Sequence, residues 1–444
     1  MVRRVLLAVS VSGLIVACSQ SLRTNPDGGR DSTGGNERFG SGGQGGVDPI
    51  GGGGGSIARG GSGGCWWTKP SGAGGVQPGE DDGWPDSPKR VPGIATNRMR
   101  VDAWTVMSPA GAPSGPRTSA SAIWTGKEMI VWGGYDGRPE ATGGRYDPAT
   151  DTWTPVSTSV APRGRGGHVA VWTGKEMIIW GGYDGASVLL SGGRYDPAAD
   201  KWSPTSTDLA PANAGEPRGI WTGSELIVWG SQEDVGVVSH GRYDPSTDTW
   251  RPVSTTGAPP LLIPSLVWTG SEMIVWGGYP AGSCASASGA IYNPATDSWR
   301  PMTSTGAPHP RYGHSAVWTG TQMIVWGGSN LASPNAASYD PVADAWYAIS
   351  EVDAPSIRAN PALFFLPDAG VPDAGRMLLW GGGSGYDAVT GAIYDFVPDR
   401  WQTVAPFPTI DAPPNSGSTQ TTVWTGSEML VWDVAFGVGG RYQP

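Results

Sequence analysis

A segment of about fifty residues recurs along this chain, and this repetition constrains the fold more than any other feature. The second copy runs from Val171 to Trp202 and reads VWTGKEMIIWGGYDGASVLLSGGRYDPAADKW. Related cores are centred on Trp132, Trp180, Trp229, Trp276, Trp326, Trp380 and Trp432. Repeats of this length are typical of propeller arrays, in which each repeat folds into one small sheet. The count predicts an all-β fold with seven blades.

Each repeat contains the pattern of four short strands, named a to d in chain order. In the second copy, residues 168–172 and 176–182 are rich in β-branched and aromatic residues and flank a glycine-containing hairpin turn. Residues 193–195 and 202–205 form shorter strands around an Asp-Pro turn. Paired glycines close strand b, and we expect them to let a neighbouring ring lie close to the backbone.

Two spacings identify the repeat. A glycine pair closes strand b in five units, beginning at Gly133, Gly181, Gly277, Gly327 and Gly381. In six units a tyrosine lies seven positions before the strand d tryptophan, as in Tyr195 and Trp202. The pattern resembles the kelch repeat over residues 98–444, which implies a kelch-like propeller. Units three and seven carry Gly230-Ser231 and Trp432-Asp433 instead, so these blades should pack less typically.

The two ends of the repeat region predict how the ring closes. The last unit has candidates for strands a, b and c, but the sequence stops at Pro444 before a strand d. Residues 99–107 have the tryptophan and the spacing of a strand d with no other strands before them. Pairing of this N-terminal strand with the last blade would complete the seventh sheet and cover its edge.

The first residues form a targeting signal. Arg3-Arg4 is followed by an apolar run from Val5 to Val16, which makes residues 1–17 a signal peptide. The run Ile15-Val16-Ala17-Cys18 resembles the lipobox of bacterial lipoproteins. That resemblance implies acylation of Cys18, insertion of the acyl chains into a lipid bilayer, and an exported protein anchored at the outer membrane or cell surface. An ordinary secretory signal is the alternative.

Residues 18–97 differ sharply in composition from the repeats. Glycine runs occur at residues 42–46, 51–55 and 60–64, and such a stretch cannot bury enough apolar surface to order itself. We interpret it as a tether. If Cys18 is acylated, Cys65 and Cys284 remain, and the sequence leaves open whether they form a disulfide or stay free thiols.

Charge and cysteine spacing argue against a nucleic-acid-binding protein and against a metal site. The net charge is −10 and the repeat region has no lysine or arginine run, so nucleic acid is not an expected partner. There is no Cys-x-x-Cys cluster, and the sequence predicts neither a metal nor a cofactor. The recurring Asp-Pro-x-x-Asp pairs are interpreted as turns, because they occur in nearly every blade. The sequence does not indicate an oligomeric state.

Binding residues are sought where the repeats differ. In an a-b-c-d blade, the a–b and c–d turns lie on one face, and these vary little here. The b–c loops and the crossings from strand d to the next strand a lie on the other face, here called the variable face, where binding usually occurs. Simple drift of these loops is the alternative. The loop candidates are Tyr135, Asp136, Tyr183 and Asp184.

A second set of candidates precedes strand a. Four arginines lie seven positions before the strand a aromatic residue, and two histidines lie four positions before it. They should surround the mouth of the channel, where arginine forks suit carboxylates or phosphates. The alternative is a structural role, with charge pairing to Asp136, Asp184 or Asp387. The set comprises Arg117, Arg165, His168, Arg311, His314 and Arg358.

These observations favour a membrane-anchored extracytoplasmic module that binds a protein or glycan through the variable face. The alternative is a carbohydrate-active enzyme at the channel mouth, because kelch-like propellers include galactose oxidase and N-acetylneuraminate epimerases. The copper site of galactose oxidase cannot be assembled from the four histidines and Cys284 of this chain. The fold permits catalysis without conferring it, and we assign no catalytic residue.

Overall fold

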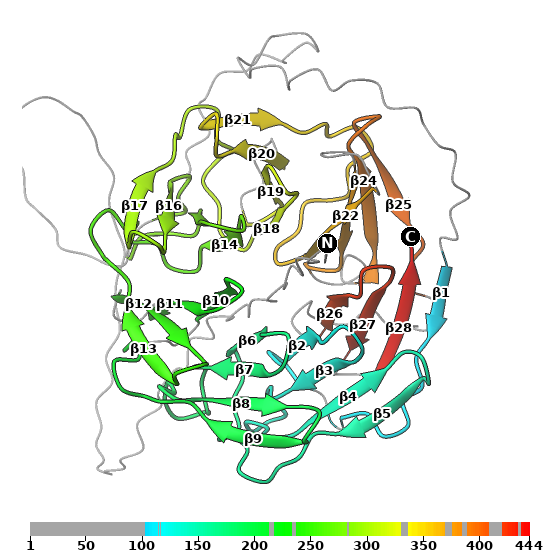
Figure 1. Ribbon diagram of the computed structural model, residues 1–444. Coiled ribbons are helices and arrows are strands. Elements are labelled where there is room, and N and C mark those ends of the chain that lie inside the picture. Colours follow the sequence, from blue (N-terminus) through cyan, green and yellow to red (C-terminus); the bar gives the residue numbers. More distant parts are fainter. Residues whose placement is uncertain are drawn as a thin grey trace, which may run out of the picture. The chain divides into compact units, whose positions relative to one another are not determined.

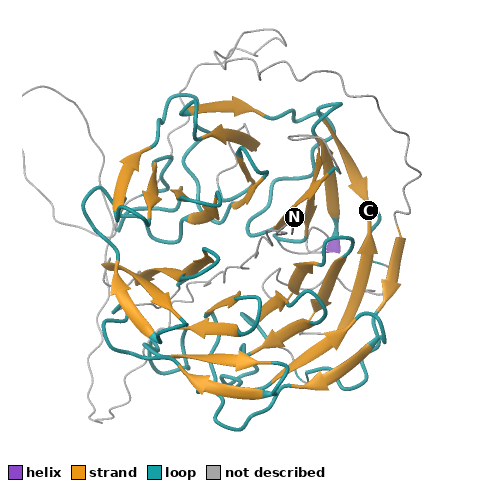
Figure 2. Ribbon diagram, viewed as in Figure 1, coloured by secondary structure: helices purple, strands orange, loops and turns teal. Residues whose placement is uncertain are grey.

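The computed structural model describes most of the repeat region. The described residues are 103–113, 115, 117–212, 217–232, 237–281, 284–329, 336–368, 375–383, 389–407, 420–433 and 437–444. All of them belong to one compact unit. The predicted signal peptide, the predicted tether and residues 98–102 lie outside the described residues. Strands and loops account for nearly all of the described chain (Figure 2).

Seven four-stranded antiparallel sheets form a ring, as Figure 1 shows. From blade 7 through blade 1 to blade 6, the first strands of successive blades contact one another, so they line the inside of the ring. This confirms the predicted seven-bladed, all-β fold. Blades 1 to 3 consist of β2 (Ser121–Trp124), β3 (Met129–Trp132), β4 (Gly143–Asp147), β5 (Thr152–Pro155), β6 (Val169–Trp172), β7 (Met177–Trp180), β8 (Gly192–Asp196), β9 (Lys201–Pro204), β10 (Arg218–Trp221), β11 (Leu226–Gln232), β12 (Val237–Asp244) and β13 (Thr249–Pro252).

The remaining blades repeat the same order of strands. Blades 4 to 6 consist of β14 (Ser265–Trp268), β15 (Met273–Trp276), β16 (Gly289–Asn293), β17 (Ser298–Pro301), β18 (Ser315–Trp318), β19 (Met323–Trp326), β20 (Ala336–Asp340), β21 (Ala345–Ala348), β22 (Ala362–Pro367), β23 (Gly375–Trp380), β24 (Gly391–Asp395) and β25 (Arg400–Val404). Blade 7 consists of β26 (Gln420–Trp424), β27 (Met429–Asp433), β28 (Val438–Gln443) and, from the other end of the repeat region, β1 (Ala103–Val106).

The ring closes through β1, as the sequence predicts. β1 pairs antiparallel with β28, and Trp104 lies opposite Tyr442 in the register that Trp153 and Tyr146 adopt in blade 1. The indole N–H of Trp104 donates to the carbonyl of Ala405 at 2.8 Å, which ties blade 7 to the segment that follows blade 6. The seventh sheet is therefore built from both ends of the repeat region.

The core is divided among the junctions between blades. Seven clusters of buried residues each combine two neighbouring blades. In every junction the strand b tryptophan of one blade packs on the strand d tryptophan of the next, with ring centroids 4.4 to 6.0 Å apart. These pairs are Trp132–Trp202, Trp180–Trp250, Trp229–Trp299, Trp276–Trp346, Trp326–Trp401, Trp380–Trp104 and Trp432–Trp153.

The tyrosine spacing and the Asp-Pro turns share one explanation. In blade 1, the hydroxyl of Tyr146 donates to Asp151 at 2.7 Å, and Asp151 also accepts the backbone N–H of Ser108 at 2.9 Å. The indole N–H of Trp153 donates to the carbonyl of Ser108 at 3.0 Å. Asp151 has a φ of 54°, a left-handed conformation that aspartate tolerates well. The second aspartate of each turn thus fastens the preceding crossing segment to the blade.

The two atypical units differ from the others, as expected. In the regular blades, strand b ends at its tryptophan because the glycine pair turns the chain; in blade 2 Gly181 and Gly182 have φ values of 70° and 87°. In blade 3, where Gly230-Ser231 replaces the pair, the β11–β12 ladder continues past Trp229 to Gln232. In blade 7 the ladder continues by one residue to Asp433.

Candidate functional site

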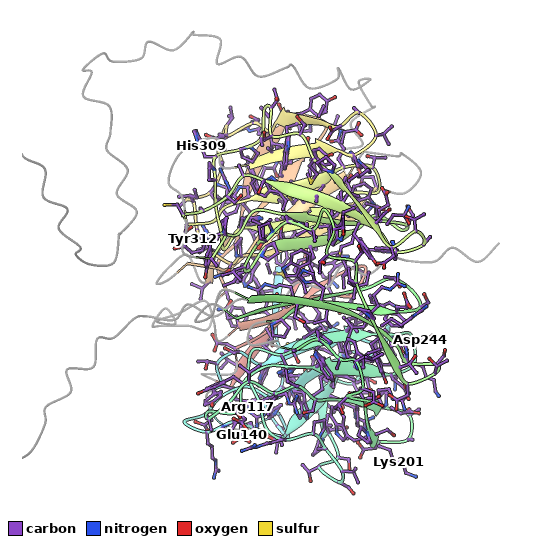
Figure 3. All side chains as sticks on the ribbon, turned by 90° about the vertical axis from the view of Figure 1, so that its left-hand side faces the viewer. Arg117, Glu140, Lys201, Asp244, His309 and Tyr312 are labelled. Atoms are coloured by element: carbon purple, nitrogen blue, oxygen red, sulfur yellow. The ribbon has the colours of Figure 1, made fainter. Side chains whose placement is uncertain are left out.

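The two faces of the propeller separate as the repeat topology predicts. In Figure 3, Glu140 of the first b–c loop lies on the same face as Arg117, His309 and Tyr312 of the crossing segments. Lys201 of β9 and Asp244 at the end of β12 lie on the opposite face. The candidate residues from the sequence therefore belong to one face, the variable face.

The four candidate arginines are buried beneath the variable face. Their exposed fractions are 2% for Arg117, 0% for Arg165, 0% for Arg311 and 6% for Arg358. In each of them an Nη1–H group donates to the carbonyl of the first glycine after strand b of the same blade. The distances are 3.4 Å from Arg117 to Gly133, 3.0 Å from Arg165 to Gly181, 3.0 Å from Arg311 to Gly327 and 3.5 Å from Arg358 to Gly381.

Further acceptors at the start of strand c hold the guanidiniums of Arg117, Arg165 and Arg358. Arg165 donates to the carbonyl and the hydroxyl of Ser191, at 2.6 and 3.2 Å, and its Nε–H donates to the carbonyl of Arg163 at 2.9 Å. Arg117 makes the corresponding bonds to the carbonyl and hydroxyl of Thr142, at 2.8 and 2.7 Å. Burial lowers the pKa of Arg165 to about 10. Each arginine thus fixes the b–c connection of its own blade.

Three of these arginines also join neighbouring blades through their backbone. The N–H of Gly134 in blade 1 donates to the carbonyl of Arg165 in blade 2 at 2.8 Å. Gly278 and Gly328 make the same bond to Arg311 and Arg358, at 2.9 and 3.0 Å. These bonds favour the structural interpretation of the arginines. Their role in anion binding stays a prediction.

The two candidate histidines lie in the same buried layer. His168 Nε2 lies 2.8 Å from the hydroxyl of Ser121 in the preceding blade, and His314 Nε2 lies 2.8 Å from the hydroxyl of Ser265. Burial lowers the pKa of both histidines to about 3, and the charges of Arg165 and Arg311 add to the effect. An imidazole with this pKa is neutral and a weak base at pH 7. The hydroxyl contacts link each histidine to the preceding blade, and a part in ligand binding stays a prediction.

The glycine pair leaves room for these rings. A Cβ atom at Gly133 would lie 2.8 Å from the carbonyl oxygen of Arg165 and 2.8 Å from Cε1 of His168. At Gly277 it would lie 2.4 Å from Cε1 of His314. All three distances are too short for a real Cβ contact, so the expectation that a neighbouring ring packs on the paired glycines is confirmed at these two junctions.

The loop candidates lie higher on the same face. Tyr135 and Asp136 are half-buried, Asp184 is buried, and Tyr183 is 42% exposed. The backbones of Tyr135 and Tyr183 pair with Thr118 and Gly166 of the crossing segments, so both tyrosines rest on fixed backbone. Burial raises the pKa of Tyr135. Of the three aspartates expected to balance the arginines, Asp387 lies outside the described residues.

Asp184 makes its direct ion pair with an arginine that the sequence did not single out, while its charge also raises the pKa of Arg165 and partly offsets the effect of burial. Its carboxylate lies 2.6 Å from Arg163, which is two residues before the arginine that the sequence singled out. The backbone N–H groups of Ala186 and Ser187 also donate to Asp184, and these bonds lower its pKa. Sequence reasoning missed Arg163 because the repeat spacing selects Arg165, and only the fold shows which of the two points outward.

Blade 4 carries a further feature on this face. Cys284, in its b–c loop, is disulfide-bonded, which excludes a free thiol at this position. Cys18 and Cys65 lie outside the described residues, so a Cys65–Cys284 pairing stays a prediction.

An aromatic contact also lies on this face at the junction of blades 4 and 5. Tyr279 of blade 4 packs edge-on against Tyr312 at a ring-centroid distance of 5.4 Å, and Tyr312 is 44% exposed.

In the part of the chain that the structure describes, no group of three or more His, Cys, Asp or Glu residues is arranged to hold a metal ion. The described residues also contain no helix that is long and apolar enough to span a membrane.

Comparison with known proteins agrees with the geometry. No curated protein matches the chain. A protein-family model described as the KLHDC2/KLHL20/DRC7 Kelch-repeats domain matches residues 94–264 and again residues 263–433. The two matches together cover most of the chain, from before β1 to the end of β27. On this evidence, the chain belongs to the Kelch-repeat family.

Proposed function

We propose that the chain is a lipid-anchored, extracytoplasmic module that binds a protein partner through the variable face. The protein-binding role follows from the family, because a Kelch propeller suggests a protein-binding module. The choice of the variable face is supported by the distribution of exposed side chains. Among the described residues, Tyr183 and Tyr312 are large, exposed aromatic side chains of the variable face: Tyr312 is labelled there in Figure 3, and Tyr183 pairs with Gly166 of a crossing segment.

Exposed tyrosines on fixed backbone suit protein recognition. A tyrosine supplies a large contact area and loses little conformational entropy on binding, and aromatic residues are enriched where interfaces gain most affinity. The turn face offers Val342 and Val397, which are 94% and 43% exposed but are single aliphatic side chains in the c–d turns. The variable face is therefore the surface we assign to the partner.

Site-specific photocrosslinking tests the assignment. A photoreactive amino acid replaces Tyr183 or Tyr312 in the full chain, and Val342 on the opposite face serves as the matched control. We expect a covalent protein adduct from both variable-face positions and none from Val342. Adducts from Val342 alone would contradict the choice of face, and a glycan adduct would identify the other ligand class.

Membrane anchoring is tested separately. The lipobox-like run before Cys18 supports it, and the expected outcome is incorporation of labelled palmitate into the full chain but not into the Cys18→Ala variant. The variant should also leave the membrane fraction. Equal labelling of both proteins would overturn this part of the proposal without affecting the binding face.

A further inference from the structure

The b–c loops of blades 1 and 2 and the segment between them form one continuous surface. The backbone N–H of Arg165 donates to the carbonyl of Glu140 at 3.2 Å. Gly164 lies against the carbonyl of Pro139, where a Cβ would approach to 2.4 Å. Gly166 and Tyr183 exchange two backbone hydrogen bonds of 3.0 and 3.1 Å. We call the exposed side chains of this surface the junction patch: Arg138, Arg163, Tyr183 and Leu190.

The two arginines of the junction patch are held in place from below. Arg163 lies 2.6 Å from Asp184, whose own carboxylate is fixed by two backbone N–H groups. Arg138 lies 3.5 Å from Glu140, and Glu140 accepts a hydrogen bond from the hydroxyl of Thr142 at 3.0 Å. Because the carboxylates position the guanidiniums before a ligand arrives, ordering them on binding should cost little.

Charge in the patch is layered. The arginine side chains are outermost, with 83% of Arg138 and 66% of Arg163 exposed, while only 17% of Glu140 and none of Asp184 is exposed. Four arginines and three carboxylates lie at this junction, which leaves a net charge of +1 in a chain of −10. They are Arg117, Arg138, Arg163, Arg165, Asp136, Glu140 and Asp184. An approaching partner therefore meets guanidinium groups first, and their remaining N–H donors suit carboxylates.

Apolar surface lies beside these charges. Tyr183 is 42% exposed and Leu190 is 44% exposed, both in the b–c loop of blade 2. A tyrosine, arginines and an aliphatic side chain on rigid backbone form the composition found at the energetic centres of protein interfaces. The matching ligand combines carboxylates with an apolar side chain.

We propose that the junction patch binds an acidic segment of a protein partner that also carries an apolar anchor residue. This inference rests on the proposed function and adds the position of the contact and the chemistry of the partner. The carboxylates of the segment bind Arg138 and Arg163, and its apolar residue packs on Tyr183 and Leu190.

A peptide array with controlled composition tests the proposal. The full chain is applied to 15-residue peptides that are acidic, neutral or basic, each with and without a leucine or phenylalanine anchor. We expect the acidic peptides with an anchor to bind best, and to lose at least about tenfold in affinity for the Arg138→Gln, Arg163→Gln variant. Raising the salt concentration should weaken binding as well.

Controls separate this inference from the proposed function. Arg400→Gln is the matched control, because this arginine is also exposed and pairs with a carboxylate, Asp353, at 2.9 Å, but begins β25 as Lys201 begins β9, outside the junction patch; it should leave binding unchanged. Loss of binding in Tyr312→Ala but not in Tyr183→Ala would overturn the junction patch and keep the variable face. Binding that ignores peptide charge, or no binding of any peptide, would overturn the inference. If Arg163→Gln does not fold, Arg138→Gln alone and Arg163→Lys replace it.

Discussion

The junction between blades 1 and 2 carries two layers of polar residues with opposite roles. In the lower layer, Arg165 and His168 are buried. Arg165 donates hydrogen bonds to backbone carbonyls, and His168 is hydrogen-bonded to the hydroxyl of Ser121. In the upper layer, Arg138 and Arg163 are mostly exposed and rest on carboxylates beneath them. The same residue type therefore stabilises the fold at one depth and is available to a partner at the other.

This difference teaches how a repeat protein can carry a site. The lower layer follows the repeat, because the glycine pair, the arginine and the strand b tryptophan recur at several junctions. The upper layer stands in loops whose length and content change from blade to blade. Substitutions in the lower layer should change stability, and those in the upper layer should change binding.

Deletion of residues 98–107 should have the largest effect, because both layers depend on a closed ring. The deletion removes β1 and exposes the edge of β28 along the register from Gly440 to Gln443. We expect loss of the whole free energy of unfolding, about 5 to 15 kcal/mol, and an aggregated product. Deletion of residues 88–97, just upstream, is the control. A soluble truncation with a cooperative thermal transition would disprove closure through β1.

Arg165→Ala should cost about 4 kcal/mol of unfolding free energy. The substitution leaves a cavity and deprives the buried carbonyls of Gly181 and Ser191 of their donor. Arg138→Ala, in the upper layer, should cost less than about 0.5 kcal/mol because its side chain is 83% exposed. Urea titration of both variants measures the contrast. Equal losses would mean that the two layers do not differ in role.

Gly133→Ala should cost about 3 kcal/mol. The residue has a φ of 73°, and the added Cβ would press on the carbonyl of Arg165 and the ring of His168. Gly126→Ala is the matched control, since Gly126 has a φ of 95° in a turn with no atom within 4 Å of the added Cβ. It should cost about 1 to 2 kcal/mol through backbone strain alone. A similar loss in both variants would refute the crowding argument.

His168 should make the protein sensitive to acid. Its pKa is about 3 in the folded state against about 6.5 in the unfolded chain, so between these values the unfolded state binds the extra proton. Stability is therefore lost as the pH falls below about 6.5, by about 2 kcal/mol at pH 5. The measurement compares thermal unfolding of the wild type and His168→Gln at pH 7 and pH 5. The variant should lose less stability over this interval, and an unchanged pH dependence would contradict the assignment.

Much of the architecture can be read from residue spacing. The fifty-residue period gives seven blades, the tyrosine and tryptophan spacing gives the pairing of strands c and d, and the unmatched Trp104 points to closure by β1. These features are local or periodic, because each blade forms its own four-stranded sheet. The role of the second aspartate as a turn residue is equally local, since Tyr146 and Asp151 are five positions apart.

The depth of each polar residue is decided only by the tertiary structure. The sequence places Arg165 at a regular position, but its burial depends on acceptors supplied after strand b and before strand c. Arg163, two residues earlier, meets Asp184 because the crossing segment packs beside the next b–c loop. The spacing along the chain shows which residues recur in each blade. Whether such a residue is buried or exposed depends on the loops and strands that the neighbouring blade packs against it, and this arrangement exists only once the sheets have formed a closed ring.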